Sequence, residues 1–471
     1  MRLAMTRIVA PPRAPHRRYV RQRAEPAPAI APAPRPTGLY PGEPETCRRS
    51  LRRFTPVLLL MGLLVAVAEV YNLEGRGFRL LLGLAAAALP VHYLLPFRWK
   101  KPFFVAASVA GLALVFGGRT AGIVLPAALG LIGLSVAPLP WRVRVLGVLG
   151  VGAALGLVRA GAVELSGLPS PVLPILGTMF MFRLIIFLYE LKHAERPEPA
   201  ADVLSYFFLL PNYCFLHFPV VDYRTMQRGY FSAEVHAVQR DGLRMMLRGF
   251  IHLLLYRLVY HELLISPEQV AGPAGLARFL VCNYLLYLHV SGQFHVACGM
   301  LHLFGFKLPE THHHYLLATG FTDYWRRINI YWKDFMVRVF FNPVAFRLKR
   351  RPQWQALAAA TAVVFVATWF LHAYQSFWLS GEWHFSVPDA LFWGVLGALV
   401  LVNVQRDARR SRGRRPRTAS APTTSGAVRA GVVRAAKVLG TFATITLLWS
   451  LWTSPSLDSW LAMLRRGLGS P

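Results

Sequence analysis

Charged residues are scarce in this chain, and acidic residues are the scarcest of them. Of its 471 residues, 16% are charged and 55% are hydrophobic, and 52 Lys and Arg outnumber 22 Asp and Glu. A typical soluble domain has about 25% charged residues, so this composition, with a mean hydropathy of +0.40, argues against one. Several apolar runs reach the ~18 residues that cross a bilayer as a helix, and no alternating strand pattern accompanies them. The sequence therefore predicts an all-α, polytopic integral membrane protein.

The chain also lacks the cysteine and serine motifs of several enzyme classes. It has four cysteines, none of them in a CxxC pair, so neither a disulfide framework nor a thiolate metal site is indicated. It has no GxSxG motif, which leaves no sequence support for a serine hydrolase. The N-terminal region is too long and too rich in proline for an ordinary signal peptide.

The formal net charge of +30 is concentrated in three segments that lie beside or between apolar spans. Residues 1–53 contain 12 Arg and 3 Glu, residues 323–351 contain 8 Lys or Arg and 2 Asp, and residues 405–417 contain 7 Arg and 1 Asp. Membrane proteins keep such segments on the cytoplasmic side, where anionic lipid also attracts them. We therefore expect a lipid bilayer, and no nucleic acid, as the partner of these charges.

Composition and hydropathy divide the chain into five regions. These are a disordered, basic, Pro- and Arg-rich cytoplasmic tail (1–53), N-terminal transmembrane helices (54–200), a core (201–404), a basic cytoplasmic loop (405–427), and a last transmembrane helix with an amphipathic tail (428–471). About 11 spans are expected, near 56–73, 78–97, 103–118, 120–138, 143–162, 171–190, 245–265, 276–304, 354–375, 387–404 and 431–452. The charges of the loops favour a cytoplasmic N-terminus in a cell inner or plasma membrane.

Residues 203–220 are apolar but are unsuited to a continuous helix. Pro211, Asn212 and Pro219 interrupt the run, and proline removes a backbone donor and breaks a helix. A re-entrant or broken helix is therefore predicted, with its irregular backbone shielded by protein. This interpretation also places the basic segment 323–351 in the cytoplasm.

Two residues are candidates for chemistry near the membrane. His372 lies within an apolar run, where polar groups are costly and often functional, and a neutral imidazole suits a general base. The alternative is a structural histidine hydrogen-bonded to a neighbouring helix. Asn329 lies in the segment YWRRINIYWKDF, and its amide suits orientation of a nucleophile or stabilisation of an oxyanion. Its alternative is an ordinary residue on a helix surface.

The other histidines are weaker candidates. The run from His312 to His314 and the series His289, His295 and His302 resemble metal-binding patterns. Three consecutive histidines cannot all face one metal from a regular helix, however, and carboxylate partners within the apolar segments are nearly absent. We therefore expect no metal site, and a histidine-rich metal oxidase is disfavoured.

Several short motifs in this chain match a known family. They are Tyr206-Phe207-Phe208 with Pro211; Ser291-Gly292 with Ala297 and Gly299; Gly305-Phe306-Lys307-Leu308-Pro309-Glu310; Tyr324-Trp325-Arg326-Arg327; and Asn329 with His372 43 positions further on. Together they make the region from about 200 to 380 resemble the membrane-bound O-acyltransferase (MBOAT) superfamily. The nearest likeness is its bacterial branch of alginate O-acetylation and teichoic-acid D-alanylation proteins.

The resemblance implies an MBOAT-like fold and an O-acyltransferase that transfers groups other than aminoacyl. It implies that His372 is the essential intramembrane histidine and that Asn329 is its partner in catalysis. An acyl-CoA or acyl carrier protein thioester would be the co-substrate, without a cofactor. A hydroxyl of a lipid, glycan or cell-surface polymer would accept the acyl group, and an accessory acyl-transfer protein is a further expected partner.

The cytoplasmic segment around Asn329 would then meet the donor. Arg326, Arg327 and Lys333 are expected to contact its phosphates, beside Trp325. The chain has Tyr331-Trp332-Lys333-Asp334 where the polymer-modifying branch has Ser-Leu-Ser, so the substrates of that branch are not carried over. The alternative from another class is a non-enzymatic transporter or flippase of a lipid-linked or acylated intermediate, since broken helices suit transport as well.

Overall fold

A computed structural model describes residues 43–192, 198–213, 221–413 and 424–469, all of which belong to one compact unit, Leu39–Pro471. The described regular structure is helical, apart from one isolated β-bridge between Tyr230 and Phe306. The all-α prediction is therefore confirmed.

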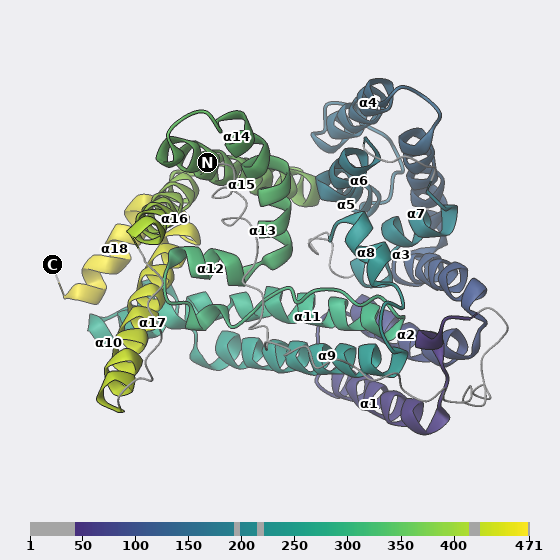
Figure 1. Cartoon of the computed structure of the whole chain (residues 1–471), viewed down its shortest axis with the longest axis horizontal. Coiled ribbons are helices and arrows are strands. Elements are labelled where there is room, and N and C mark those ends of the chain that lie inside the picture. The colour runs from purple at the N-terminus through teal and green to yellow at the C-terminus, as the bar shows by residue number, and fades with distance from the viewer. Residues whose placement is uncertain (1–42, 193–197, 214–220, 414–423, 470–471) are drawn as a thin grey trace, which may run out of the picture. The chain divides into compact units, whose positions relative to one another are not determined.

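Eighteen α-helices follow one another along the described residues (Figure 1). They are α1 (Leu51–Val70), α2 (Arg76–Leu94), α3 (Phe97–Val136), α4 (Trp141–Arg159), α5 (Val172–Thr178), α6 (Leu184–Leu191), α7 (Ala200–Phe207), α8 (Tyr223–Gly229), α9 (Val235–Leu258), α10 (Gly272–Leu285), α11 (Tyr287–Leu303), α12 (Phe321–Ile328), α13 (Ile330–Met336), α14 (Asn342–Arg347), α15 (Gln353–Ser380), α16 (Val387–Gly413), α17 (Thr424–Trp452) and α18 (Leu457–Leu468).

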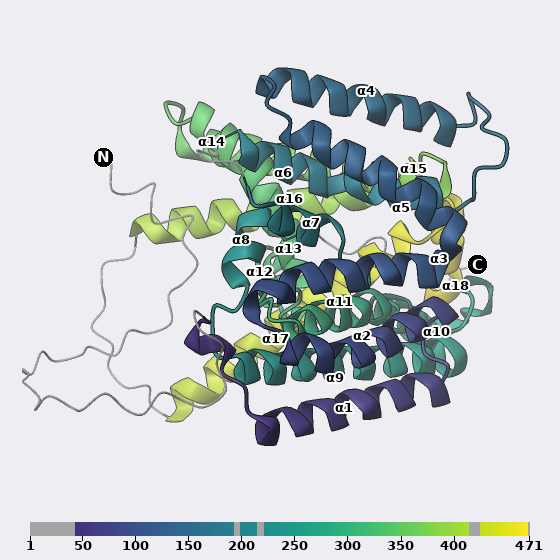
Figure 2. The same cartoon turned by 90° about the vertical axis from the view of Figure 1, so that its right-hand side faces the viewer.

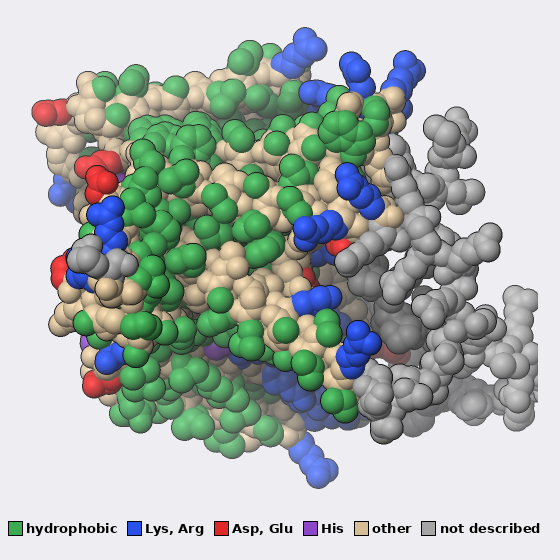
Figure 3. Space-filling view, turned by 90° about the vertical axis from the view of Figure 1, so that its left-hand side faces the viewer, with side chains coloured by type: hydrophobic (Ala, Val, Ile, Leu, Met, Phe, Trp, Pro, Cys, Tyr) green, Lys and Arg blue, Asp and Glu red, His purple; other side chains and the backbone are tan. Residues whose placement is uncertain are grey.

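Seven of the described helices are long and apolar enough to cross a membrane: α1, α2, α3, α4, α15, α16 and α17. Figure 2 shows α1, α2, α4 and α9 running in roughly the same direction. On the face drawn in Figure 3, a broad apolar band has mainly Lys and Arg along one edge and both acidic and basic side chains along the other. These features are compatible with a multi-pass membrane protein.

The remaining predicted spans are helices that are interrupted or more polar. Span 171–190 is α5 and α6 joined by the π-helical turn Met179–Arg183, and span 276–304 is α10 and α11, which meet at Leu286. Span 245–265 lies in α9 and its π-helical extension Val259–Leu263. Spans 103–118 and 120–138 together form α3, which Gly117 interrupts with φ 81° and ψ 158°. That backbone conformation strains any residue with a Cβ, so glycine sets the boundary there.

Helices α9 and α11 lie side by side and contact each other through glycine (Figures 1 and 2). An added Cβ at Gly299 would lie 2.5 Å from the carbonyl oxygen of Gly242, and one at Gly249 would lie 2.7 Å from that of Gly292. Small residues at these four positions allow the two backbones to touch. This contact fixes α11, which carries much of the polar core described below.

The predicted interruption after residue 203 is present in the described residues. Helix α7 ends at Phe207 and is followed by the 3-10 turn Leu210–Tyr213. The guanidinium of Arg183, which is buried, donates to the carbonyls of Tyr206 and Phe207 at 3.1 and 2.8 Å. These bonds satisfy carbonyls at the helix end that have no partner within the helix. Residues 214–220, including Pro219, lie outside the described residues.

Folded structure extends further than expected into two of the predicted regions. Disorder was expected through residue 53, but the segment from residue 43 is folded: Glu43 accepts from Arg49 at 2.9 Å and from the backbone of Phe97 at 2.7 Å, and Cys47 is buried. These contacts fix the start of α1, whereas residues 1–42 lie outside the described part. The loop expected over 405–427 is shorter, because α16 continues to Gly413 and α17 begins at Thr424. Arginine favours helix, so the basic character of the segment did not mark its end.

Candidate active site

A cavity of about 450 Å³ lies among α11, α12, α13, α15, α16 and α17. Its walls are mostly apolar and aromatic, and they include five tryptophans. Both His372 and Asn329 line it, although 43 residues separate them in the sequence. Among the described lining residues none is a carboxylate, lysine or arginine. The cavity therefore suits a neutral, largely apolar group.

His372 is held in this cavity by aromatic rings. Its imidazole is parallel to the Trp332 indole, with centroids 5.1 Å apart and planes 6° apart. The rings of Trp393 and Trp452 lie 4.8 and 6.0 Å away. The two imidazole nitrogens form no hydrogen bond with any residue that the structure describes. These contacts therefore do not support the alternative of a structural histidine that is hydrogen-bonded to a neighbouring helix.

Asn329 lies at the junction of α12 and α13 in extended conformation, with φ −150°. Its Oδ1 accepts the backbone N–H of Trp332 at 3.1 Å, which caps α13. The next residue, Ile330, donates its N–H to the carbonyl of Thr311 at 2.9 Å. Asn329 therefore has a structural role as a cap, and it also lines the cavity.

The expected donor-binding residues are only partly brought together. Trp325 lines the cavity and packs against Phe365, with centroids 4.8 Å apart. Arg326 is exposed, Arg327 pairs with Asp323 at 2.7 Å, and Lys333 pairs with Asp334. None of the three cations lines the cavity, so any contact they make with a donor lies outside it.

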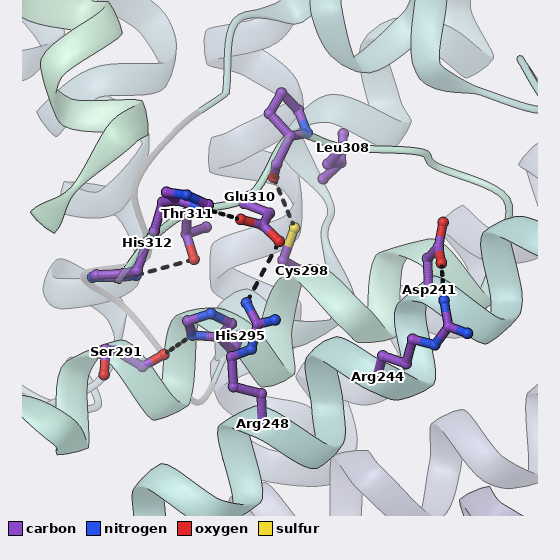
Figure 4. Close-up of polar contacts among 12 residues, drawn as sticks. Asp241, Arg244, Arg248, Ser291, His295, Cys298, Leu308, Glu310, Thr311 and His312 are labelled. Carbon is purple, nitrogen blue, oxygen red and sulfur yellow. Dashed lines mark hydrogen bonds and ion pairs between the residues drawn. The ribbon is translucent and has the colours of Figure 1, made fainter. Parts of the chain in front are cut away.

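The three consecutive histidines differ in burial: His312 is buried, whereas His313 and His314 are exposed. His312 lies next to His295, with ring centroids 5.5 Å apart, and its Nε2 is 3.0 Å from the hydroxyl of Tyr287. The Nδ1 of His295 donates to the carbonyl of Ser291 at 2.6 Å (Figure 4). Because Tyr287 also lines the cavity, this polar core adjoins the site.

A surface ion pair lies beside that core. Figure 4 shows Arg248 of α9 reaching toward Glu310, with 3.5 Å between the paired atoms. Burial by itself would raise the pKa of Glu310, but the hydrogen bond from His313 and the charge of Arg248 lower it. Within the described residues, no group of three or more His, Cys, Asp or Glu side chains is arranged to hold a metal ion.

A second polar anchor fixes the segment that follows α13. Arg338, in the π-helical turn Val337–Phe341, pairs with Glu190 at 2.7 Å and with Asp222 at 3.3 Å. Burial would raise the pKa of Asp222, but the hydroxyl and N–H of Thr225 and the charge of Arg338 lower it. The anchor connects this turn to α6 and α8.

Sequence reasoning missed Asp389 and the tryptophans that surround His372. Asp389 lies in the first turn of α16, and its carboxylate accepts the indole N–H groups of Trp369 at 2.5 Å and Trp452 at 2.7 Å. The available signal was a lone carboxylate at the start of an apolar segment, VPDALFW. Its partners lie on two other helices, so no local pattern indicated them.

No protein-family model matches the chain, and no curated protein matches it. The described fold is all-helical, and its seven long apolar helices are compatible with a multi-pass membrane protein.

Proposed function

We propose that this protein is a membrane-embedded O-acyltransferase of the MBOAT superfamily. It moves an acyl group from a thioester, carried by coenzyme A or a carrier protein, to a hydroxyl of a lipid, glycan or cell-surface polymer. The observation that carries the proposal is that His372, with its ring nitrogens unengaged, and Asn329 line one apolar cavity. The motif resemblance, which selects the same two residues, is independent support.

His372 is the general base of the proposed reaction. A ring nitrogen accepts the proton of the acceptor hydroxyl while the hydroxyl oxygen attacks the thioester carbonyl. The carbon–sulfur bond then breaks, and the leaving thiolate takes the proton from the imidazolium, which restores the neutral ring. Because Oδ1 of Asn329 is occupied as a helix cap, its amide N–H is the group available to donate to the developing oxyanion.

The cavity supplies binding for the acyl chain. A volume of about 450 Å³ with aromatic and aliphatic walls suits an apolar chain and keeps water from the thioester. The phosphates of a donor would remain outside, where Arg326 is exposed. No cofactor or metal is required, and an accessory protein that delivers or removes the acyl group is compatible with this arrangement.

The proposal includes a location. We place the protein in a cell inner or plasma membrane, with its N-terminus in the cytoplasm and about 11 crossings. The concentration of Lys and Arg along one edge of the apolar band in Figure 3 supports this orientation. The additional crossings would be the two halves of α3 and the interrupted helices α5–α6, α9 and α10–α11.

The test compares lipids and surface glycans of a deletion strain by mass spectrometry after complementation. The wild-type gene should restore an acylated species that the deletion strain lacks, and His372→Ala should not restore it at equal membrane abundance. His384→Ala is the matched control, because His384 is exposed in the loop after α15. Full acylation by His372→Ala would refute the mechanism, and an unchanged deletion strain would refute the activity.

A further inference from the structure

Asp389, on α16, forms hydrogen bonds to side chains of α15 and α17, and it thereby connects three helices around His372. From the first turn of α16 it accepts the indole N–H of Trp369 on α15, three residues before His372, and that of Trp452 on α17. It is half-buried, and its carboxylate adjoins the cavity without lining it. An acidic side chain in an apolar segment is costly. Here its carboxylate accepts two indole N–H groups.

One of the two rings bonded to this carboxylate, that of Trp452, lies beside His372. Trp452 donates to Asp389 and places its ring 6.0 Å from the imidazole centroid. Trp393, one helical turn after Asp389 on α16, lies 4.8 Å away, and Trp332 covers the imidazole from α13. Indole faces attract cations with a strength of about 0.5–2 kcal/mol, and tryptophan is the most effective ring. An imidazolium at this position would therefore be stabilised by ring faces rather than by a direct carboxylate partner.

The charged and titratable groups around His372 are few. Tyr287 and Tyr324 line the same cavity, from α11 and α12. Tyr287 is bonded in turn to His312 at 3.0 Å. From α16, Asp389 is the acidic group that reaches the rings around His372, and it does so through Trp452. An indole that donates its N–H to an anion carries more electron density on its ring face, so the charge of Asp389 is transmitted toward the imidazole.

We propose that Asp389 is a positioning residue that acts on His372 through Trp452. It holds the indole against the imidazole and stabilises the imidazolium that forms when the acceptor hydroxyl gives up its proton. No bond to Asp389 forms or breaks, and the proton returns from His372 to the leaving thiolate. This inference rests on the proposed function for its catalytic meaning, but its physical content, a raised affinity of His372 for protons, can be measured without any substrate.

A purely structural role is the competing explanation. Asp389 lies in the first turn of α16, where a carboxylate also interacts favourably with the helix dipole. A structural role predicts lower stability in Asp389→Asn and an unaltered proton affinity of His372. The positioning role predicts a weaker base even where the fold is retained, and it predicts the same effect from Trp452→Phe, which leaves Asp389 in place.

The test measures carbethoxylation of His372 by diethyl pyrocarbonate, which reacts with the neutral imidazole. The full-length protein in detergent micelles is treated across a range of pH, and the His372 peptide is quantified by mass spectrometry. In Asp389→Asn the midpoint should move to lower pH by about 0.5–1 unit, since loss of a nearby negative charge disfavours the protonated form. Trp452→Phe should move it in the same direction, because the ring remains while its N–H is lost.

Asp458→Asn, which changes an exposed carboxylate at the start of α18, should leave the midpoint unchanged. The acylated species should fall in Asp389→Asn without disappearing, because the weaker base still accepts a proton. Midpoints equal to wild type in both Asp389→Asn and Trp452→Phe would overturn the positioning role, whatever the activity. Shifted midpoints in a protein with no acyl transfer would instead uphold the contact and refute the proposed function.

Discussion

The imidazole of His372 lies parallel to the indole of Trp332, and the backbone of Trp332 donates to the side chain of Asn329. Trp332 therefore connects the two candidate catalytic residues, because its ring packs on His372 and its backbone N–H is bonded to Asn329. Its own indole N–H points to Thr368 of α15 at 3.4 Å. The position of α13 thus depends on Asn329 at its start and on α15 along its side, so changes at these residues must separate packing from chemistry.

Asn329→Asp is expected to separate the cap from the amide. Aspartate caps a helix about as well as asparagine, so thermal stability in detergent should stay close to that of wild type. The variant lacks the amide N–H and adds a negative charge to the cavity wall, so acyl transfer should fall by about 10²-fold or more. Asn329→Ala, which loses the cap as well, should be destabilised by about 1 kcal/mol. Wild-type activity in Asn329→Asp would show that the residue is only a cap.

Leu396→Trp is expected to change the length of acyl group that the protein uses. Leu396 is buried and lines the cavity from α16, so a tryptophan side chain there would occupy part of the cavity volume of about 450 Å³. Transfer of a long acyl chain should fall more than transfer of a short one, as measured with a series of acyl-CoA donors of increasing length. Leu447→Trp, at a partly exposed position on α17, is the control and should leave the length preference unchanged. An equal loss for all donors would indicate that the cavity does not hold the chain.

The sequence was sufficient for the class of the protein and for the identity of the two cavity residues. Hydropathy predicts the all-helical fold because a helix is one of the few ways to satisfy a backbone in lipid. It places a boundary between the spans 103–118 and 120–138, close to the break at Gly117. It does not predict the interruptions inside the spans 171–190 and 276–304. His372 and Asn329 are candidates because of their local sequence context and a motif, whereas Asp389 has no local signal of its role, because its bonds join three helices that are distant in sequence.

The ion pairs of Arg338 predict acid sensitivity. Asp222 has a lower pKa in the folded protein than in the unfolded chain, so its contribution to stability is complete above the ordinary aspartate pKa of about 3.9. That contribution is lost as the pH falls through the lower, folded pKa. Arg338→Met removes one cause of the lowering, so the variant should be less stable than wild type near neutral pH, and the difference should shrink as the pH falls through the folded pKa of Asp222. Arg347→Met, at an exposed position, should follow the wild-type curve, and coincident curves for all three proteins would contradict the prediction.

Gly249→Ala tests whether the contact between α9 and α11 holds the polar core in place. The added Cβ would lie 2.6 Å from Cγ2 of Val296 and 2.7 Å from the carbonyl oxygen of Gly292, so the two helices must separate. Overpacking of this kind costs about 1–3 kcal/mol, and a lower melting temperature in detergent is expected.

Gly62→Ala is the matched control for this substitution. A Cβ at Gly62, within α1, would meet nothing within 4 Å, and alanine is the better helix former by about 1 kcal/mol. The control should therefore be as stable as wild type or slightly more stable. Because α11 carries Tyr287 and Val290 on the cavity wall, acyl transfer should also fall in Gly249→Ala and not in Gly62→Ala. A Gly249→Ala protein with wild-type stability would show that the two backbones are not in contact.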